Sequence, residues 1–488
     1  MVAVIAMPFV VRGLGTERFG LLSLAWVVMG YFTIFDLGLG RATTKFVAEA
    51  LGKGEGGRVS QIIWTAVTVQ AIMGAIGALA LFLMTDYLVE RVLNIPPALI
   101  YEAEATFRLL AFAIPLVLLS SSFSGVMEAA QRFDLVNSVK IPTSTLTYLI
   151  PLIGLYLGFG LSGIVLLILI ARVGALVALA AISIRTNPGL RKYSFSVSTF
   201  SHLFAYGGWI AVTSIVGPIL IYLDRFLIGS LITIAAVAYY TVPYEAVTRL
   251  WLIPASLTMT LFPAFSSLES IKDNHKLGTV FARSIKYVLL SLGPILVFIA
   301  LFAGDILRFW MGDDFAAEST IAMQLLAFAV LINSIANMPF ALIQGVGRPD
   351  ITAKFQLLEL FVYIVVAWFL IGKFGIAGAA GAWTIRVVLD ALLLFTAAFK
   401  VCRFSPTLLA ENGMTPAVLE LMMLACIGYG LKAFAYALPF ICQSLLFIGI
   451  VVAFIIFAWN YVLDDLDQGL VINAMKPKIT WRAHYEQE

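Results

Sequence analysis

A succession of long apolar segments, separated by short polar ones, is the feature that most constrains how this chain can fold. A helix that crosses a bilayer needs about 20 mostly apolar residues. Backbone groups in the hydrocarbon must be paired within their own segment, so we expect each segment to be an α-helix. Of the 488 residues, 61% are hydrophobic and 12% are charged, whereas about 25% are charged in a typical soluble domain. The sequence therefore predicts an all-α polytopic membrane protein and excludes a soluble globular protein, a disordered protein and a nucleic-acid-binding protein.

Fourteen segments can be counted, and we expect each to cross the membrane once. They comprise residues 1–12, 19–40, 61–84, 106–127, 141–158, 161–184, 204–223, 236–262, 287–303, 321–343, 355–372, 376–399, 417–437 and 440–463. With the N-terminus in the cytoplasm, the cytoplasmic loops and tail carry twenty Lys and Arg residues, and the opposite loops carry about six. Because positively charged loops stay in the cytoplasm, both termini are predicted to be cytoplasmic.

An internal repeat with an offset of about 216 residues organises these segments. The sequence LLAFA at 109–113 recurs at 325–329, RFD at 132–134 corresponds to RPD at 348–350, and FGLSG at 159–163 corresponds to FGIAG at 374–378. Each copy holds six segments, so both copies enter the membrane with the same orientation. We therefore expect two six-helix lobes (1–200 and 201–402), an additional helix pair (403–463) and a cytoplasmic tail (464–488). Such lobes can rock around a central cavity, although a duplicated scaffold without transport activity is the alternative.

Arginines inside the apolar segments indicate candidate sites, because each costs about 2.5–3.5 kcal/mol to insert. Arg172 lies near the middle of its segment and has no acid three or four residues away. It therefore needs an acid on another helix, a water-filled cavity or an anionic ligand. Three other arginines can be neutralised by an acid one helical turn away: Arg108 by Glu104, Arg249 by Glu245, and Arg386, the near counterpart of Arg172 in the repeat, by Asp390.

Acidic and hydroxyl residues supply further candidates. Asp36 can pair with Arg41 or Lys45, or it can bind a coupling ion, H⁺ or Na⁺. We expect Asp224 and Arg225 to form a pair at the membrane interface, and Glu359 to lie close to Lys354. Polar clusters occupy equivalent depths in the two copies, with Ser120, Ser121, Ser122 and Ser124 in one and Asn333, Ser334 and Asn337 in the other. Such clusters hold helices together or line a hydrophilic cavity, and the sequence leaves both interpretations open.

Cysteine and histidine are too sparse to indicate a cofactor. The three cysteines form no CxxC pair, and the three histidines all fall in polar stretches. The chain therefore predicts no disulfide framework, no metal site and no histidine-based catalytic centre. We expect a protein that is not an enzyme and that uses no cofactor.

Several short motifs carry a family resemblance. Near the N-terminus they are Pro8, RGLG at 12–15, ERFG at 17–20, Tyr31 and DLGL at 36–39; later come LDRFLIG at 223–229, Tyr239, Tyr240, Pro243 and GVGRPD at 345–350. From about residue 5 to residue 463, the chain resembles the Wzx-like polysaccharide repeat-unit flippases. These belong to the multidrug/oligosaccharidyl-lipid/polysaccharide flippase superfamily.

This resemblance implies two six-helix lobes around a V-shaped cavity, with two additional helices. It implies transport of a polyprenyl-pyrophosphate-linked oligosaccharide across the inner (cytoplasmic) membrane for surface polysaccharide biosynthesis, alongside polysaccharide assembly proteins. Because the guanidinium fork matches phosphate, we expect Arg172 and Arg386 to bind pyrophosphate. Ser121 and Asn337 are the expected polar ligands, and Asp36 is the candidate coupling-ion site.

Two other functions remain open from the sequence. One is a multidrug or metabolite antiporter of the same superfamily, although an unpaired arginine rather than an acid in mid-segment argues against cationic drugs. The other is a membrane polysaccharide polymerase or ligase, which would place its chemistry on a large outer loop. The largest outer loops here have about 20 residues and carry no catalytic His or paired acids, so we favour the flippase.

Overall fold

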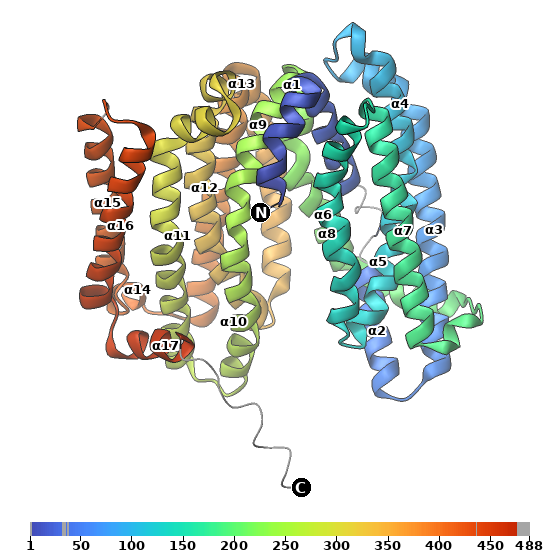
Figure 1. Ribbon diagram of the computed structural model, residues 1–488. Helices are drawn as coiled ribbons and strands as arrows, with labels where there is room; N and C mark the ends of the chain where they lie inside the picture. Colours follow the sequence, from blue (N-terminus) through green and yellow to red (C-terminus); the bar gives the residue numbers. More distant parts are fainter. Residues whose placement is uncertain (1, 32–35, 37–38, 436, 476–488) are drawn as a thin grey trace. The chain divides into compact units, whose positions relative to one another are not determined.

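A computed structural model describes residues 2–31, 36, 39–435 and 437–475, and every regular element within these ranges is helical. The α-helices, labelled in Figure 1, are α1 Val2–Tyr31, α2 Leu39–Gly52, α3 Gly56–Tyr87, α4 Ile100–Ala111, α5 Ala113–Ala129, α6 Phe133–Tyr156, α7 Leu161–Thr186, α8 Val197–Leu231, α9 Ile234–Thr248, α10 Leu252–Ser270, α11 Asn274–Met311, α12 Asp313–Gly345, α13 Pro349–Cys402, α14 Leu408–Glu411, α15 Met414–Phe434, α16 Phe440–Phe457 and α17 Asp465–Met475. Residues 32–35 and 37–38 of the second predicted segment, and residues 476–488 of the predicted tail, lie outside the described ranges.

Among the described residues, nine helical segments are long and apolar enough to cross a membrane. They are Gly56–Val92, Pro97–Ala129, Leu161–Thr186, Ile234–Ser270, Asn274–Met311, Asp313–Gly345, Pro349–Cys402, Met414–Phe434 and Phe440–Val462. The prediction of an all-α polytopic membrane protein is confirmed. The exact number of fourteen spans stays a prediction.

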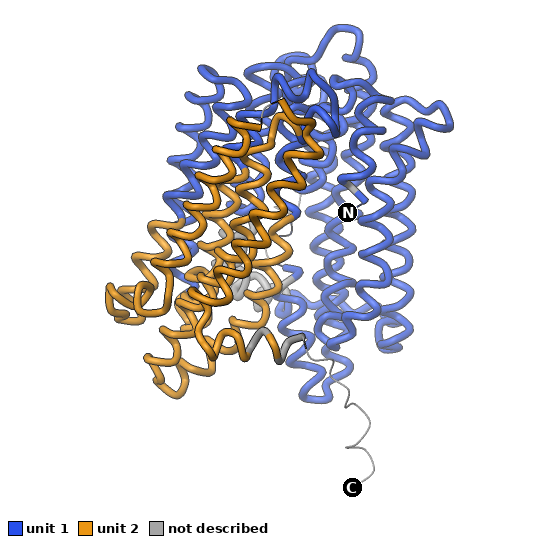
Figure 2. The backbone as a smooth tube through the Cα atoms, turned by 60° about the vertical axis from the view of Figure 1, so that its left-hand side comes forward, with its two compact units in different colours: residues 1–249, 306–326, 349–390 blue, residues 250–305, 327–348, 391–488 orange. Residues whose placement is uncertain are grey.

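The chain divides into two compact units, coloured separately in Figure 2. Unit 1 contains residues 1–249, 306–326 and 349–390, and unit 2 contains residues 250–305, 327–348 and 391–488. Within unit 1, α5 packs against α3 and α7, and α6 packs against α7 and α1. The predicted lobes, 1–200 and 201–402, stay a prediction.

Glycines break two helices where the sequence predicted separate spans. Gly15 interrupts α1 with φ 78°, and Gly375 interrupts α13 with φ 58°. Both angles lie in the left-handed region, which glycine enters without steric cost. The 54-residue α13 therefore contains both the predicted segment 355–372 and the predicted segment 376–399.

The turns before α6 and α13 are alike, as the internal repeat predicts. Gln131 has φ 57° and Gly347 has φ 79°, and these positions are 216 residues apart. Each is followed by an arginine that precedes the first residue of its helix, Arg132 before α6 and Arg348 before α13. The RFD and RPD motifs thus mark the same kind of helix start.

In unit 2, α17 is anchored to α11 by charged groups. The Lys286 Nζ lies 2.5 Å from a carboxylate oxygen of Asp467, and the side chains are 2% and 0% exposed. Arg283 also contacts Asp464 at 2.6 Å. Burial raises the pKa of Asp467, but hydrogen bonds donated by Lys286 and Tyr287 outweigh burial and hold that pKa below its ordinary value. The carboxylate therefore stays ionised and keeps α17 in place.

Candidate functional site

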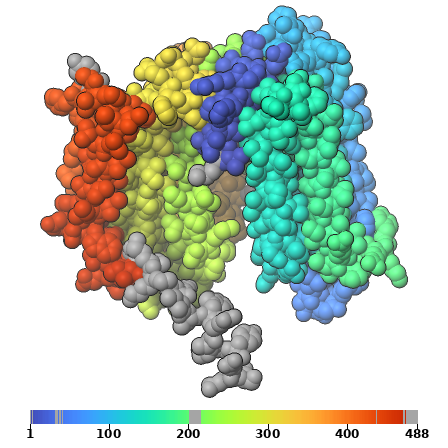
Figure 3. Space-filling view, in the orientation of Figure 1, coloured from blue at the N-terminus to red at the C-terminus, as the bar shows by residue number. Residues whose placement is uncertain are grey.

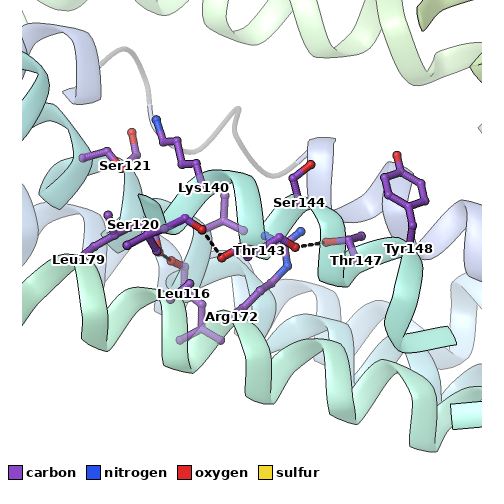
Figure 4. Close-up of a pocket in the computed structure, with 14 residues that line it drawn as sticks. Leu116, Ser120, Ser121, Lys140, Thr143, Ser144, Thr147, Tyr148, Arg172 and Leu179 are labelled. Atoms are coloured by element: carbon purple, nitrogen blue, oxygen red, sulfur yellow. Dashed lines mark hydrogen bonds between the residues drawn. The ribbon is translucent and has the colours of Figure 1, made fainter. Parts of the chain in front are cut away.

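A cavity of about 590 Å³ lies among α5, α6 and α7 of unit 1 (Figure 4). Its lining residues are Leu116, Val117, Ser120, Ser121 and Ser124 of α5; Val139, Lys140, Thr143, Ser144, Thr147 and Tyr148 of α6; and Arg172, Ala175 and Leu179 of α7. Seven of these side chains carry a hydroxyl group. The cavity is therefore an open recess among predominantly apolar helices, and its lining carries a cluster of hydroxyl groups.

Helical spacing explains why these hydroxyl groups share one cavity. Residues three and four apart lie on the same face of a helix, and α5 contributes Ser120, Ser121 and Ser124 in this way. On α6 the polar positions 140, 143, 144, 147 and 148 follow the same spacing. The sequence analysis identified the α5 cluster but missed the α6 stripe, whose three-and-four spacing was visible in the sequence.

The cavity hydroxyls are partly satisfied by their own helices. Thr143 donates to the Val139 carbonyl at 2.7 Å, and Thr147 donates to the Thr143 carbonyl at 3.0 Å. A hydroxyl that donates its proton still has lone pairs that accept hydrogen bonds. The cavity wall can therefore accept hydrogen bonds from a ligand rich in hydroxyl groups.

Arg172 is the cation of the cavity without an acid partner in the described part of the chain. Figure 4 shows its side chain extending from α7 toward the face of α6 that carries Thr143 and Thr147. Its Nε atom is buried and has no hydrogen-bond partner, and no ion pair to it is found among the described residues. Of the three partners that the sequence left open, an acid on another helix is thus missing there. A ligand or water in the cavity remains.

The second cation at the cavity, Lys140, is different. Its Nζ lies 2.9 Å from a carboxylate oxygen of Glu128, and both side chains are partly exposed. Lys140 is therefore compensated within the protein. It adds positive potential at the cavity without the desolvation penalty that Arg172 bears.

Asp224 and Arg225 form the predicted pair, and the pair is deeply buried within the protein. The two side chains are 0% and 2% exposed and lie 3.8 Å apart. Tyr240 donates its hydroxyl proton to Asp224 at 2.5 Å, and the Arg225 guanidinium lies 4.1 Å from the centre of the Tyr244 ring. The predicted helix end at these residues was wrong, since α8 continues to Leu231 and α9 packs against it. The position of the pair at the membrane interface stays a prediction.

The buried pair continues toward the cavity through a chain of polar contacts. Glu245 lies 3.8 Å from Arg225 and also pairs with Arg249, which confirms the predicted pair one helical turn apart. Arg249 donates to the Tyr148 hydroxyl at 2.7 Å, and Tyr148 lines the cavity. The chain from Arg225 to Tyr148 therefore joins the network in the core of unit 1 to the cavity wall.

Arg386 belongs to this network of acids and aromatic rings. It lies 3.7 Å from Glu359, whose side chain is 2% exposed, and its guanidinium lies 5.6 Å from the Tyr363 ring centre. The carboxyl groups of Glu359 and Asp390 are neighbours. Lys354 pairs with Asp350 at 3.5 Å, so the expected proximity of Glu359 to Lys354 stays a prediction. Tertiary packing brought Arg386 and Glu359 together across 27 positions of α13, a distance that local spacing cannot reveal.

The predicted pair of Arg108 and Glu104 is present at 3.4 Å, and Arg108 also contacts Asp86 at 2.7 Å. These side chains are partly exposed and paired with each other, so they do not indicate a binding site.

Asp36 takes part in a hydrogen-bonded chain beside the cavity. It accepts from the Gly40 backbone N–H at 3.2 Å and from the Gln70 amide at 2.5 Å. Gln70 accepts in turn from the Ser122 hydroxyl at 2.5 Å, and both of these side chains are fully buried. The chain links the start of α2 to α3 and α5, so Asp36 has a role in holding these helices.

The remaining predicted site residues lie in different places. Ser121 lines the cavity with Arg172. Asn337 belongs to unit 2 and donates to the carbonyl of Asn333 at 3.0 Å. Neither Arg386 nor Asn337 is among the residues that line the cavity.

Comparisons with known proteins identify the family of this chain. The family model for polysaccharide biosynthesis proteins matches residues 1–269. A protein of Shigella flexneri named as an O-antigen transporter is 30% identical over 406 residues, which cover 82% of this chain and 94% of that protein. The family model and the Shigella relative each cover more than half of the chain. The expected resemblance to the flippase superfamily is confirmed.

Solved structures of the same superfamily share the fold. An inward-facing MATE-family multidrug resistance transporter gives a TM-score of 0.71 at 17% identity, covering 82% of this chain and 94% of that one. The lipid II flippase MurJ, in an inward closed conformation, gives a TM-score of 0.68 at 14% identity, covering 93% and 98%. The sequence match and the shared fold together show that the chain belongs to the polysaccharide biosynthesis protein family.

Proposed function

We propose that this chain is a flippase that moves a polyprenyl-pyrophosphate-linked oligosaccharide across the cytoplasmic membrane by alternating access, for surface polysaccharide biosynthesis. The observation that carries the proposal is the uncompensated Arg172 in a hydroxyl-lined cavity of about 590 Å³. The name of the Shigella relative, an O-antigen transporter, and the lipid II flippase with the same fold support it.

The chemistry of the cavity suits such a substrate. The guanidinium group presents donors in a planar fork, which binds two phosphate oxygens at once. Ser121 and the hydroxyls of Thr143 and Thr147 offer hydrogen bonds to sugar hydroxyls. A polyprenyl tail needs no polar partner and stays in the lipid, so only the hydrophilic head has to enter the protein.

The membrane potential favours the outward direction. An inside-negative potential contributes about 2.3 kcal/mol per elementary charge per 100 mV, so an anionic head gains energy as it moves outward. The loop charges support a chain with both termini in the cytoplasm. Export can therefore be driven by the potential, with coupling to H⁺ or Na⁺ as an additional source of energy.

Three residues keep their predicted roles as part of this proposal. Arg386 and Asn337 are proposed to contact the substrate in a conformation other than the one described, since here they bind protein groups. Asp36 is the proposed coupling-ion site, and its hydrogen bonds from Gly40 and Gln70 would have to exchange for the ion. Unchanged H⁺ and Na⁺ dependence of transport in Asp36→Asn would remove this role.

Transport of a fluorescently labelled lipid-linked oligosaccharide in proteoliposomes tests the function. We expect the wild-type chain to accelerate movement of the label between leaflets, and Arg172→Ala to lose at least about tenfold of that rate, as expected for a lost charge-assisted contact. Arg58→Ala is the matched control, because Arg58 is exposed and pairs with Glu55. If wild-type protein moves no labelled lipid but exports cationic drugs, the chain is an antiporter instead.

A further inference from the structure

The hairpin of α15 and α16 in unit 2 carries a groove of about 180 Å³ that is separate from the cavity described above. The α15 side begins at Glu420 and continues with Met423, Leu424 and Ile427. The α16 side runs from Ile450 to Phe457 with the same spacing of three and four residues. One face of each helix therefore forms one wall of the groove.

Glu420 is the one charged residue among those lining the groove. Its side chain is 3% exposed, and neither carboxylate oxygen has a hydrogen-bond partner in the described part of the chain. The backbone N–H of nearby Ala458 donates to the carbonyls of Phe454 and Ile455 in its own helix. No ion pair to Glu420 is found among the described residues either.

A buried carboxylate with neither a cation nor hydrogen bonds is unstable in hydrocarbon. A cation supplied from outside the chain would allow the Glu420 carboxylate to stay ionised in this position. A ligand that brings an ammonium group would complete the pair, and each N–H would donate to a carboxylate oxygen.

The groove is polar at one end, where Glu420 lies, and apolar along the rest of its length. Glu420 is six residues from the start of α15, which places it about 9 Å along the helix, and the apolar wall continues for about 10 Å beyond it. The charged end therefore lies toward one end of the hairpin and the apolar part extends toward the middle.

The bilayer is the nearest source of an occupant for this groove. Large apolar side chains on the outside of the hairpin are strongly exposed, such as Leu419 at 58%, Ile448 at 55% and Val452 at 50%. Figure 3 shows α15 and α16 as one continuous red surface. Lipid surrounds such a surface in the membrane. A lipid whose head carries a positive charge would therefore complement Glu420.

We propose that the groove between α15 and α16 binds an aminophospholipid, whose primary ammonium group pairs with Glu420 and one of whose acyl chains lies along Met423, Leu424 and Ile427. This site is independent of the transport cavity and does not depend on the function proposed above. It would fix the lipid beside the hairpin, outside the duplicated part of the sequence.

Native mass spectrometry of the full chain tests this proposal with three lipids of identical acyl chains: phosphatidylethanolamine, phosphatidylcholine and phosphatidylglycerol. The ethanolamine head carries N–H donors, the choline head has a positive charge but none, and the glycerol head has no positive charge. We expect the wild-type chain to retain phosphatidylethanolamine about tenfold better than either of the others, as for one charge-assisted hydrogen bond. Glu420→Gln should abolish the preference, and Glu49→Gln, an exposed acid paired with Lys53, should keep it.

Equal retention of the three lipids by the wild-type chain would overturn the proposal, whatever the variants do. So would a Glu420→Gln chain that keeps the full preference, which would mean that the lipid binds elsewhere. If Glu420→Gln does not fold, the comparison of the three lipids on wild-type protein decides alone.

Discussion

Two arginines in unit 1 have opposite surroundings. Arg225 is 2% exposed, lies 3.8 Å from Asp224 and Glu245, and stacks on Tyr244 at 4.1 Å. Arg172 has no acid partner in the described residues, and a polar cavity adjoins it instead. The first charge is neutralised by protein groups, and the second is left for whatever enters the cavity.

Whether a buried charge has an acid partner distinguishes structural from functional arginines better than the extent of burial does. A buried ion pair holds helices in register but is satisfied, so it offers nothing to a ligand. An unpaired charge beside a cavity raises the energy of the empty protein, and a ligand of opposite charge recovers that energy. Arg172 therefore has the properties of a binding residue, and Arg225 has those of a structural one.

Removing Arg225 should have the largest effect on stability. Arg225→Leu leaves Asp224 buried without its cation, although the hydrogen bonds from the Tyr240 hydroxyl and from the backbone N–H of residue 225 remain. Loss of one partner of a buried pair costs about 3–5 kcal/mol. We expect a clear fall in the thermal unfolding temperature of the detergent-purified protein. Arg172→Leu is the matched control and should be neutral or stabilising, since leucine inserts into membrane more favourably than arginine by about 3 kcal/mol. Equal losses in the two variants would break the comparison.

Removing Arg386 should cost less than removing Arg225. Arg386→Leu leaves Glu359 and Asp390 in contact with each other, and two neighbouring carboxyl groups can share a proton, so we expect a loss of about 1–3 kcal/mol. The same thermal measurement checks the order. A loss greater than that of Arg225→Leu would show that Arg386, rather than Arg225, is the centre of the network.

The shape of the cation at position 172 should matter for transport and not for stability. Arg172→Lys keeps the charge but loses the planar fork, so it should lower the flipping rate by about tenfold at unchanged unfolding temperature. The rate is read from labelled lipid in proteoliposomes. A lysine variant as fast as the wild type would mean that charge alone is recognised.

Loss of the hydrogen bond between Arg249 and Tyr148, which links the Arg225 network to the cavity, should have the smallest effect on stability and transport. Tyr148→Phe removes the hydroxyl that accepts from Arg249 at 2.7 Å, while the pair of Arg249 and Glu245 remains. We expect a loss of about 1 kcal/mol or less in stability, and a change of less than about fivefold in flipping rate. A larger loss of transport would indicate that the network and the cavity act together.

The sequence predicted the fold class and the unusual position of Arg172 because both follow from local patterns. Apolar segments reveal helices in lipid, and an arginine without an acid one turn away is visible in the chain itself. The α6 stripe was equally local and was overlooked because Thr143 and Ser144 resemble ordinary helix-packing residues. Contacts between distant residues are different. The pairing of Glu359 with Arg386 and the burial of Asp224 depend on how helices pack, which neither spacing nor composition contains.

The central claim is that Arg172 binds an anionic ligand in the cavity, and ligand-induced stabilisation tests it most directly. The unfolding temperature of the full chain is measured with and without inorganic pyrophosphate, for the wild type, Arg172→Leu and Arg58→Leu. Binding at 100 times the dissociation constant stabilises a protein by about 2.7 kcal/mol, so the wild type and Arg58→Leu should unfold at higher temperature with pyrophosphate, and Arg172→Leu should not respond. An unchanged response in Arg172→Leu, or none in the wild type, would contradict the account.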